Sequence, residues 1–385
     1  MLFAKLNDLS IGGKGAYGIA ASAVERKADL PTYLRITDIF DDGTLNLNEL
    51  KSVDAPNSDK YILKPNDIVF ARTGGSTGRN YFYDGSDGVF VYAGFLIKFS
   101  IDPEKVNPKY VKYYCRSKQY NDWVQSFNTG STRGNINAQT FGNMEIPLPE
   151  RKQQDYLVSI LEPIDEKIKN NKQVNDNLAG LLQTIYQERF SNDILAVNQG
   201  VLSDICSYSR DKVAVSELNV STYFSTENML SGKAGSTEAT SLPTTSQTTA
   251  CHKGDTLISN IRPYFKKIVY CEGNCGCSTD VLCFTPSQPR YSTYLFSTLY
   301  ADKFFAFMVA GSKGTKMPRG DKQQIMTYPV VLPSEEELAR FNTIASPLLE
   351  QIYSNRAENK RLSILRDTLL PKLMSGEIDV SAVQL

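Results

Sequence analysis

The chain has little histidine and no excess of basic charge, and both shortages restrict its possible functions. Among its 385 residues there is one histidine, His252, and 42 lysine and arginine residues are balanced by 42 aspartate and glutamate residues. Histidine is the usual general base near neutral pH and the commonest metal ligand. We therefore expect neither a histidine-based hydrolytic triad nor a multi-histidine metal site. The bulk charge does not indicate any particular partner.

Long apolar segments and a disulfide framework are also missing. The first residues, MLFAKLNDLS, lack the basic and apolar regions of a secretory signal, and no apolar run approaches the roughly 20 residues of a membrane span. Seven cysteines are too few, in a chain of this length, for a disulfide scaffold. The expectation is a cytoplasmic protein with reduced thiols and no membrane partner.

The cysteines near His252 do not predict a metal site. Zinc ligands usually occur in pairs spaced C-x2-C, whereas Cys271, Cys275 and Cys277 follow the pattern C-x3-C-x-C. The corresponding segment earlier in the chain, GVFVYAGF, contains no cysteine. We expect no bound metal here.

The chain contains an internal duplication. Pro333 follows Pro149 by 184 residues, just as Pro347 follows Pro163. Beyond these prolines, apolar residues recur at alternating intervals of four and three residues, which is typical of helices that pair through a heptad seam. The duplication therefore predicts two long, similar helices.

Both copies carry asparagines at the same two positions of this seam. They are Asn171 and Asn175 in the first copy, and Asn355 and Asn359 in the second. A buried asparagine in a coiled-coil seam usually fixes the register and the choice of partner. We therefore expect the two helices to pair with each other.

The segments before the helices repeat more loosely. The block LKPNDIVFAR, with Asp67, corresponds to CHKGDTLISN, with Asp255. Strand-like runs such as DIVFAR, GVFVYAGFLIKF and DVLCFTP are separated by turn residues, and one helix is expected before the Gly130 loop and before the Gly311 loop. The predicted fold class is α+β, with two mixed α/β domains each followed by a long helix, and the two helices pairing as an antiparallel coiled coil in a pseudo-twofold repeat. The predicted boundaries are 1–149 for the first domain, 150–192 for the central helix, 193–333 for the second domain, 334–376 for the C-terminal helix and 377–385 for the tail.

The order of these motifs resembles the specificity (S) subunit of type I restriction-modification systems. In the first helix the resemblance rests on IPLPERKQQDYLVSILEPIDEKI and NDNLAGLLQTIYQERF. In the second it rests on VLPSEEELARFNTIASPLLEQI and NKRLSILRDTLLPKLMSG. The KPNDIVFAR block, which lies in the first domain, is a further mark of the resemblance. The second helix has SEEELAR where the first has ERKQQDY, a departure that bears on how partner subunits dock there.

This resemblance implies a DNA-reading subunit with no catalytic site and no cofactor of its own. Each mixed domain would be a target recognition domain that reads one half of a bipartite double-stranded DNA site. The paired helices would set the spacing between the halves and dock two modification subunits. Those methyltransferase subunits would bind S-adenosylmethionine, and restriction subunits that use ATP would join the complex.

Candidate DNA-contacting residues are polar or cationic side chains in four Gly-rich loops. Phosphate contacts supply affinity and base-edge contacts supply discrimination, while glycine lets the backbone approach a phosphate closely. The stretch ARTGGSTGRNY provides Arg72, Thr73, Ser76, Arg79 and Asn80, and NTGSTRGNINAQ provides Ser131, Arg133 and Asn135. In the second domain, SNIRPYFKK provides Asn260, Arg262, Lys266 and Lys267, and AGSKGTKMPRGDKQQ provides Lys313, Lys316 and Arg319.

Two other functions stay open at this point. A coiled-coil scaffold could present both domains to protein partners without binding DNA, and it would lack the steep salt dependence of phosphate contacts. A stand-alone DNA-modifying enzyme is disfavoured, because the sequence has no Gly-rich S-adenosylmethionine motif and no NPPY-like quartet. The nearest string is NPKY at Asn107.

Overall fold

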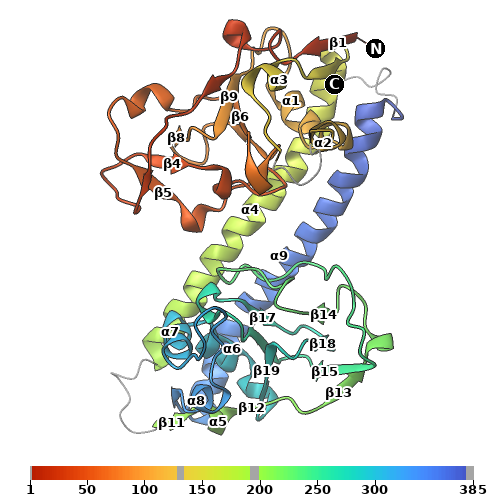
Figure 1. Ribbon diagram of the computed structural model, residues 1–385. Coiled ribbons are helices and arrows are strands. Elements are labelled where there is room, and N and C mark those ends of the chain that lie inside the picture. The colour runs from red at the N-terminus through yellow and green to blue at the C-terminus, as the bar shows by residue number, and fades with distance from the viewer. Residues whose placement is uncertain (1, 128–133, 191–198, 379–385) are drawn as a thin grey trace. The chain divides into compact units, whose positions relative to one another are not determined.

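The computed structural model describes residues 2–127, 134–190 and 199–378, which fall into two compact units (Figure 1). Unit 1 comprises Met1–Ile168 together with Lys360–Leu385, and unit 2 comprises Lys169–Asn359. Each unit therefore contains one mixed domain together with part of both long helices. Among the described helices, none is both long enough and apolar enough to cross a membrane.

The two long helices lie close to the predicted ranges. Helix α4 runs over Arg151–Phe190 and α9 over Glu335–Ser375, so each is about 60 Å long at 1.5 Å per residue. Helix α9 begins with a capping box, in which the Glu337 amide donates to the Ser334 hydroxyl and the Ser334 amide donates to the Glu337 carboxylate. It ends before Gly376, whose φ of 75° is the left-handed conformation that commonly terminates a helix.

Unit 1 contains two four-stranded sheets and a two-stranded ladder. The first sheet has the order β2 (Ala16–Tyr17), β9 (Leu96–Ser100), β6 (Asp67–Ala71) and β7 (Asn80–Tyr83). The second has the order β3 (Ala23–Val24), β5 (Lys51–Val53), β4 (Thr32–Leu34) and β8 (Phe90–Tyr92). The ladder pairs β1 (Leu2–Lys5) with β10 (Glu145–Leu148), and the short helices are α1 (Pro108–Tyr114), α2 (Lys118–Gln125) and α3 (Ala138–Gly142).

Unit 2 also contains two four-stranded sheets and a two-stranded ladder. Its first sheet has the order β12 (Cys206–Tyr208), β19 (Val281–Pro286), β16 (Thr256–Ser259) and β17 (Ile268–Tyr270). Its second sheet has the order β13 (Lys212–Ala214), β15 (Gln247–Cys251), β18 (Cys275–Cys277) and β14 (Tyr223–Phe224). The ladder pairs β11 (Gln199–Val201) with β20 (Pro329–Val331), and the short helices are α5 (Leu202–Ile205), α6 (Ser292–Tyr300), α7 (Asp302–Ala310) and α8 (Lys322–Met326).

The first sheets of the two units are therefore copies of each other in strand order and direction. The aspartates that anchored the sequence comparison have the same local role, since Asp67 accepts a hydrogen bond from the Lys64 amide and Asp255 accepts one from the His252 amide, both at 2.8 Å. The second sheets share a parallel edge pair but differ in strand order. The duplication is thus strict around β6 and β16 and loose elsewhere.

The single helix expected before each Gly loop is instead a pair of short helices, which corrects that prediction. In unit 1 the break falls at Ser117, whose extended backbone and side-chain bond from the Tyr120 amide begin α2. In unit 2 the break falls at Ala301, which has an extended ψ of 141° between α6 and α7. A new N-cap or one extended residue is sufficient to end a helix whose side chains remain apolar on both sides.

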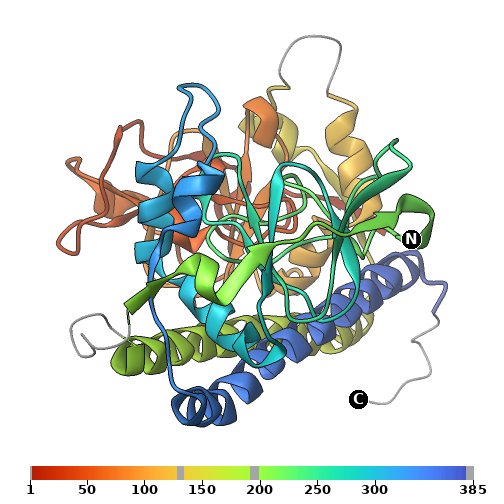
Figure 2. The ribbon, with the colours of Figure 1, turned by 90° about the horizontal axis from the view of Figure 1, so that it is seen from below.

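The core of each unit lies between its first sheet and the long helices. In unit 1, Phe70 and Phe99 from the sheet share one apolar cluster with Leu161 of α4 and Leu370 of α9. Unit 2 is built in the same way, with α6 contributing to the layer between sheet and helices, and both views show α4 and α9 along one side of its sheets (Figures 1 and 2).

Candidate nucleic-acid interface

The two candidate loops of unit 1 meet at the end of the central strand β6. Thr73 forms an isolated antiparallel bridge with Asn135, and the Ile136 amide donates to the Arg72 carbonyl at 2.9 Å. The Thr77 hydroxyl adds a bond to the Gly134 carbonyl at 2.9 Å. Two stretches more than fifty residues apart in the sequence thus form one continuous surface.

The two candidate loops of unit 2 meet in the same way at the end of β16. Ile261 bridges Arg319, and the Arg262 amide donates to the Pro318 carbonyl at 2.8 Å. The Gly320 amide donates to the Asn260 carbonyl at 3.3 Å. These bonds correspond to those of unit 1, because Asn135 and Arg319 are 184 residues apart, which is the offset of the duplication.

The candidate side chains differ in their exposure. Asn135, Lys313, Lys316 and Arg319 are exposed. Seven others are half-buried, namely Arg72, Thr73, Ser76, Arg79, Arg262, Lys266 and Lys267. Ser131 and Arg133 lie outside the described residues.

Several loop cations are held by carboxylates close to them. The pairs are Arg79–Asp41 at 2.6 Å, Lys266–Asp302 at 2.9 Å, Lys313–Asp321 at 2.5 Å and Arg319–Asp280 at 3.0 Å. Hydrogen bonds from lysines lower the pKa of Asp302 and of Asp321, so both carboxylates stay charged at neutral pH. Exposed ion pairs contribute at most about 1 kcal/mol, and a phosphate can therefore replace the carboxylate at little cost.

Asn80 and Asn260, which are also predicted to contact DNA, are buried. Asn80 is 8% exposed and its side-chain amide donates to the Cys115 carbonyl at 2.9 Å. Asn260 is 7% exposed and its backbone forms the bond to Gly320 described above. The Asn80 side chain and the Asn260 backbone therefore hold the loops from inside the fold.

Tyr17 belongs to this surface and was missed in the sequence. The Arg72 guanidinium lies 5.2 Å from the centre of the Tyr17 ring, and the Tyr17 hydroxyl accepts a bond from the Ala138 amide at 3.1 Å. The Arg72 Nε is buried and has no hydrogen-bond partner in the described part of the chain. Tyr17 lies on a two-residue strand far upstream, and the turn-like GGKGAYG around it gave no functional signal.

The turn from Arg262 to Lys266 has a strained backbone. Arg262 and Lys266 have φ values of 50° and 51°, in the left-handed region that costs a non-glycine residue about 1–2 kcal/mol. The Gly232 amide donates to the Phe265 carbonyl and the Lys233 amide to the Lys266 carbonyl, so a neighbouring segment holds the turn in place. Such strain is often concentrated at ligand-binding sites.

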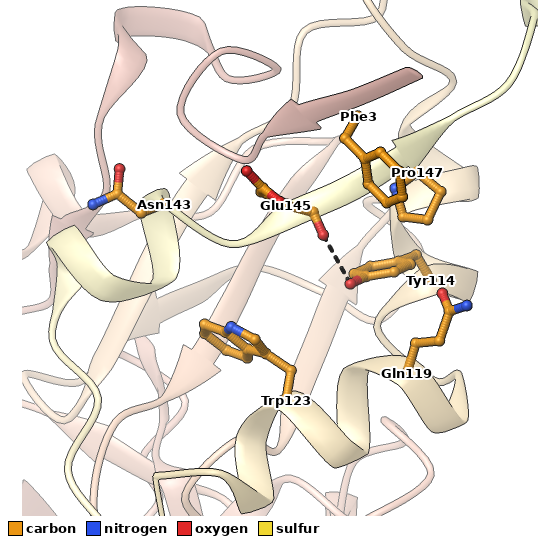
Figure 3. Close-up of a pocket in the computed structure, with 7 residues that line it drawn as sticks. All are labelled: Phe3, Tyr114, Gln119, Trp123, Asn143, Glu145 and Pro147. Carbon is orange, nitrogen blue, oxygen red and sulfur yellow. Dashed lines mark hydrogen bonds between the residues drawn. The ribbon is translucent and has the colours of Figure 1, made fainter. Parts of the chain in front are cut away.

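A separate pocket of about 450 Å³ lies in unit 1 between α2 and the β1–β10 ladder (Figure 3). Trp123 points from α2 toward the ladder, and Phe3 lies beside its register partner Pro147. The Tyr114 hydroxyl donates to the Glu145 carbonyl at 3.0 Å, and burial raises the pKa of Tyr114 to about 12. Its described lining residues include no histidine and no cysteine.

The seam asparagines of α4 and α9 are brought together within unit 2. The Asn171 side-chain amide donates to the Asn359 side-chain oxygen at 2.9 Å and to the Glu358 carboxylate at 2.7 Å. The Asn355 side-chain amide donates to the Asn175 oxygen at 2.9 Å. Because the numbers rise along α4 as they fall along α9, these segments run antiparallel.

An ion cluster joins the same helices within unit 1. Asp165 of α4 pairs with Arg366 of α9 at 3.1 Å and with Lys112 and Arg116 at 3.2 and 2.8 Å. Burial would raise the pKa of Asp165, but the three cations outweigh it and lower the pKa to about 2. The carboxylate is therefore charged throughout the physiological range.

Comparison with known proteins shows what the chain is similar to. Residues 26–179 match the family described as the type I restriction modification DNA specificity domain. The similarity to type I specificity subunits inferred from the sequence is thereby confirmed.

The individual relatives cover most of the chain at low identity. The type I restriction enzyme MjaIX specificity subunit of Methanocaldococcus jannaschii is 22% identical over 340 residues, which are 73% of this chain and 71% of the relative. The HindI specificity subunit of Haemophilus influenzae is 23% identical over 202 residues, which are 50% of this chain and 43% of the relative. A crystal structure of a type I restriction-modification system S subunit from M. genitalium has the same fold, with a TM-score of 0.57 at 17% identity over 97% of this chain and 95% of that one. Specificity subunits of type I systems are non-catalytic, and the catalytic activities lie on partner subunits.

Proposed function

We propose that this chain is the DNA sequence-recognition subunit of a type I restriction-modification complex, and that each unit reads one half of a bipartite double-stranded site. One observation carries the proposal. In both units, two Gly-rich loops with cationic or amide side chains are joined by backbone hydrogen bonds at the end of the central strand. A surface built twice on one chain suits a ligand that presents two sites.

The equivalent positions Asn135 and Arg319 support reading of different bases by the two units. Both side chains are exposed, and both residues form the bridge that joins the two loops of their unit. Asparagine pairs with the major-groove edge of adenine, whereas arginine pairs with that of guanine. Lys313 and Lys316 precede Arg319 in the same loop and are suited to neighbouring phosphates, which carry most of the affinity.

In this proposal α4 and α9 pair as an antiparallel coiled coil that sets the distance between the half-sites and docks two methyltransferase subunits. The asparagine bonds of unit 2 and the Asp165 cluster of unit 1 support a single register, since a slip by one turn would separate every one of these pairs. S-adenosylmethionine would bind to the modification subunits, and ATP to the restriction subunits. A stiff spacer holds the second unit near its half-site once the first unit has bound, so that two modest affinities combine into a higher one.

The competing function is a coiled-coil scaffold that binds proteins and not DNA. The strained turn at Arg262, which carries cations, and the paired Gly-rich loops favour DNA. Glycine lets the backbone approach a phosphate closely, and a surface that binds proteins does not require this. The two functions differ in salt dependence, since the logarithm of the DNA-binding constant falls linearly with the logarithm of salt concentration.

The test is selection from a random pool of DNA duplexes by the full chain assembled with its modification subunits. We expect an enriched motif with two specified halves and an unspecified gap of constant length, and affinity that falls steeply with salt. A single continuous motif would contradict the two-unit reading. Salt-independent binding without an enriched motif would support the scaffold.

A further inference from the structure

Unit 2 contains a cluster of cysteines that DNA recognition does not use. Five of the seven cysteines of the chain lie in one buried apolar cluster between the two four-stranded sheets, and all seven are free thiols. The five are Cys251, Cys271, Cys275, Cys277 and Cys283. Unit 1, by contrast, contributes one cysteine, Cys115, to its core.

The thiols of this cluster do not have equivalent partners. Cys251 donates to the Thr249 carbonyl, Cys277 to the Val281 carbonyl, and Cys283 to the Asp255 carboxylate. Cys275 alone among the five donates to another sulfur in the described structure, that of Cys271, at 3.5 Å. One pair is therefore already in contact.

The chain connectivity also favours this pair. Cys271 follows β17 directly and Cys275 begins β18, and the three residues between them are exposed. A bond between the two sulfurs would close a short loop at the point where the chain passes from one sheet to the other. It requires the sulfurs to approach from 3.5 Å to about 2.05 Å.

Cys275 is the better nucleophile of the two. It is 7% exposed against 2% for Cys271, so a small oxidant reaches it first. Interaction with the Cys251 and Cys271 thiols lowers the pKa of Cys275. Cys251 also acts to lower the pKa of Cys271, but the Cys275 thiol and burial outweigh it and raise the pKa of Cys271 well above its usual value. The thiolate, rather than the thiol, is the form that attacks.

We infer that Cys271 and Cys275 form an oxidation site, which hydrogen peroxide converts into an intramolecular disulfide. The Cys275 thiolate attacks one peroxide oxygen, so that an S–O bond forms, the O–O bond breaks and the leaving hydroxide takes a proton to become water. The Cys271 sulfur then attacks the sulfenic sulfur of Cys275, the S–S bond forms, and a second water leaves with the remaining protons. Two thiols and one peroxide give one disulfide and two waters.

The closest alternative pairing lies across the β15–β18 ladder. Cys251 and Cys275 are direct register partners of these antiparallel strands. Cys251, however, donates to a carbonyl rather than to the Cys275 sulfur, and it is 1% exposed. A metal site is the other reading of five cysteines, but the described residues include no group of three or more His, Cys, Asp or Glu side chains able to hold a metal ion.

The test uses the full chain, reduced and then treated with increasing hydrogen peroxide. Remaining thiols are alkylated with iodoacetamide after denaturation, and the protein is cleaved with trypsin and with a glutamate-specific protease. Glu272 lies between the two cysteines, so cleavage separates the peptide of Cys271 from the peptide that carries Cys275, Cys277 and Cys283, while Cys251 falls in a third peptide. Fragmentation of the linked pair by tandem mass spectrometry then shows which of the three cysteines is bonded to Cys271. We expect this linked pair to be the first product, two of the seven thiols to disappear, and dithiothreitol to restore them.

Variants and metal analysis complete the design. Cys275→Ser should lose no thiols to a disulfide, whereas Cys206→Ser, in the other core cluster of unit 2, should still form the linked peptides. If Cys275→Ser does not fold, the peptide map of the unaltered chain still decides. A first product that joins Cys251 to Cys275, a thiol count that stays at seven in folded protein, or one equivalent of thiol-bound zinc in the purified chain would each overturn the proposal.

Discussion

The side-chain amide of Asn355 donates a hydrogen bond to the side-chain oxygen of Asn175 at 2.9 Å, inside the contact between α9 and α4 in unit 2. Both residues are buried, at 7% and 8% exposure, and the Gln351 amide donates to the Asn355 oxygen at 2.7 Å. A chain of bonded amides of this kind satisfies polar groups that would otherwise be costly in an apolar seam.

The first prediction concerns this pair. Asn355→Ala leaves the buried Asn175 oxygen without its donor and should lower the free energy of unfolding by about 1–3 kcal/mol. The double variant with Asn175→Ala should cost less than the sum of the two single variants, because the orphaned partner is removed as well. Urea denaturation measures both. Asn170→Ala, on the exposed face of α4, is the matched control and should shift stability by less than about 0.5 kcal/mol. Strictly additive costs would show that the bond does not contribute.

The second prediction concerns Asp165 and pH. Its pKa is about 2 in the folded chain and about 3.9 in an unfolded one, so the charged cluster stabilises the folded state above pH 4. This contribution, about 2–3 kcal/mol, is lost as the pH falls through the folded pKa. The difference in stability between the unaltered chain and Asp165→Asn should therefore be constant from pH 7 to pH 5 and shrink below pH 4.

The control for this prediction is Asp367→Asn. Asp367 also contacts Arg366, at 2.9 Å, but its side chain is 64% exposed. Its removal should change stability by at most about 1 kcal/mol. Equal losses of stability in the two variants would show that the cluster around Asp165 contributes no more than the exposed pair.

The third prediction separates phosphate contacts from general charge. Lys316→Ala should weaken DNA binding by the assembled complex evenly across sequences and reduce the slope of log affinity against log salt by about 1. Lys253→Ala removes the same charge at the opposite end of β16 from the loops and should leave the slope unchanged. Binding titrations at four salt concentrations measure the slopes. Equal effects of the two variants would place DNA elsewhere on unit 2.

The fourth prediction distinguishes, in unit 1, a residue that contacts DNA bases from a residue that positions the loop. Asn135→Ala should relax the sequence preference of one half-site with little loss of stability, because the side chain is exposed. Asn80→Ala should do the reverse and cost about 1–2 kcal/mol of stability while the preference is retained, because its bond to Cys115 is internal. Duplex selection and urea denaturation of both variants give the comparison. A relaxed half-site in folded Asn80→Ala would contradict this division.

The parts of the fold that the sequence predicts are those with a local pattern. The 4–3 spacing of apolar residues, the matched asparagines and the stop at Gly376 are local, so α4 and α9 are found close to the expected ranges. The block around Asp67 and Asp255 is also local, and its turn and strand occur in both units. The breaks at Ser117 and Ala301 were missed because one residue changes conformation while the apolar pattern continues.

The site was only partly predictable, because its contacts join segments far apart in the chain. The loops were identified from their glycines and cations, but the Thr73–Asn135 bridge depends on how the sheet packs. Asn80 and Asn260 are buried and so do not lie on the surface, which the sequence did not indicate. Tyr17 was found only because its ring contacts the Arg72 guanidinium. The sulfur contact between Cys271 and Cys275 likewise arises where the chain passes from β17 in one sheet to β18 in the other. C-x3-C spacing alone does not predict that crossing.

The most direct test of DNA recognition is a map of methylated adenines in cells with the modification subunits, compared between this chain, no chain, and Arg319→Ala. The account predicts a bipartite motif that is absent without the chain and that loses discrimination in one half with Arg319→Ala. Methylation that is unchanged when the chain is absent would contradict it.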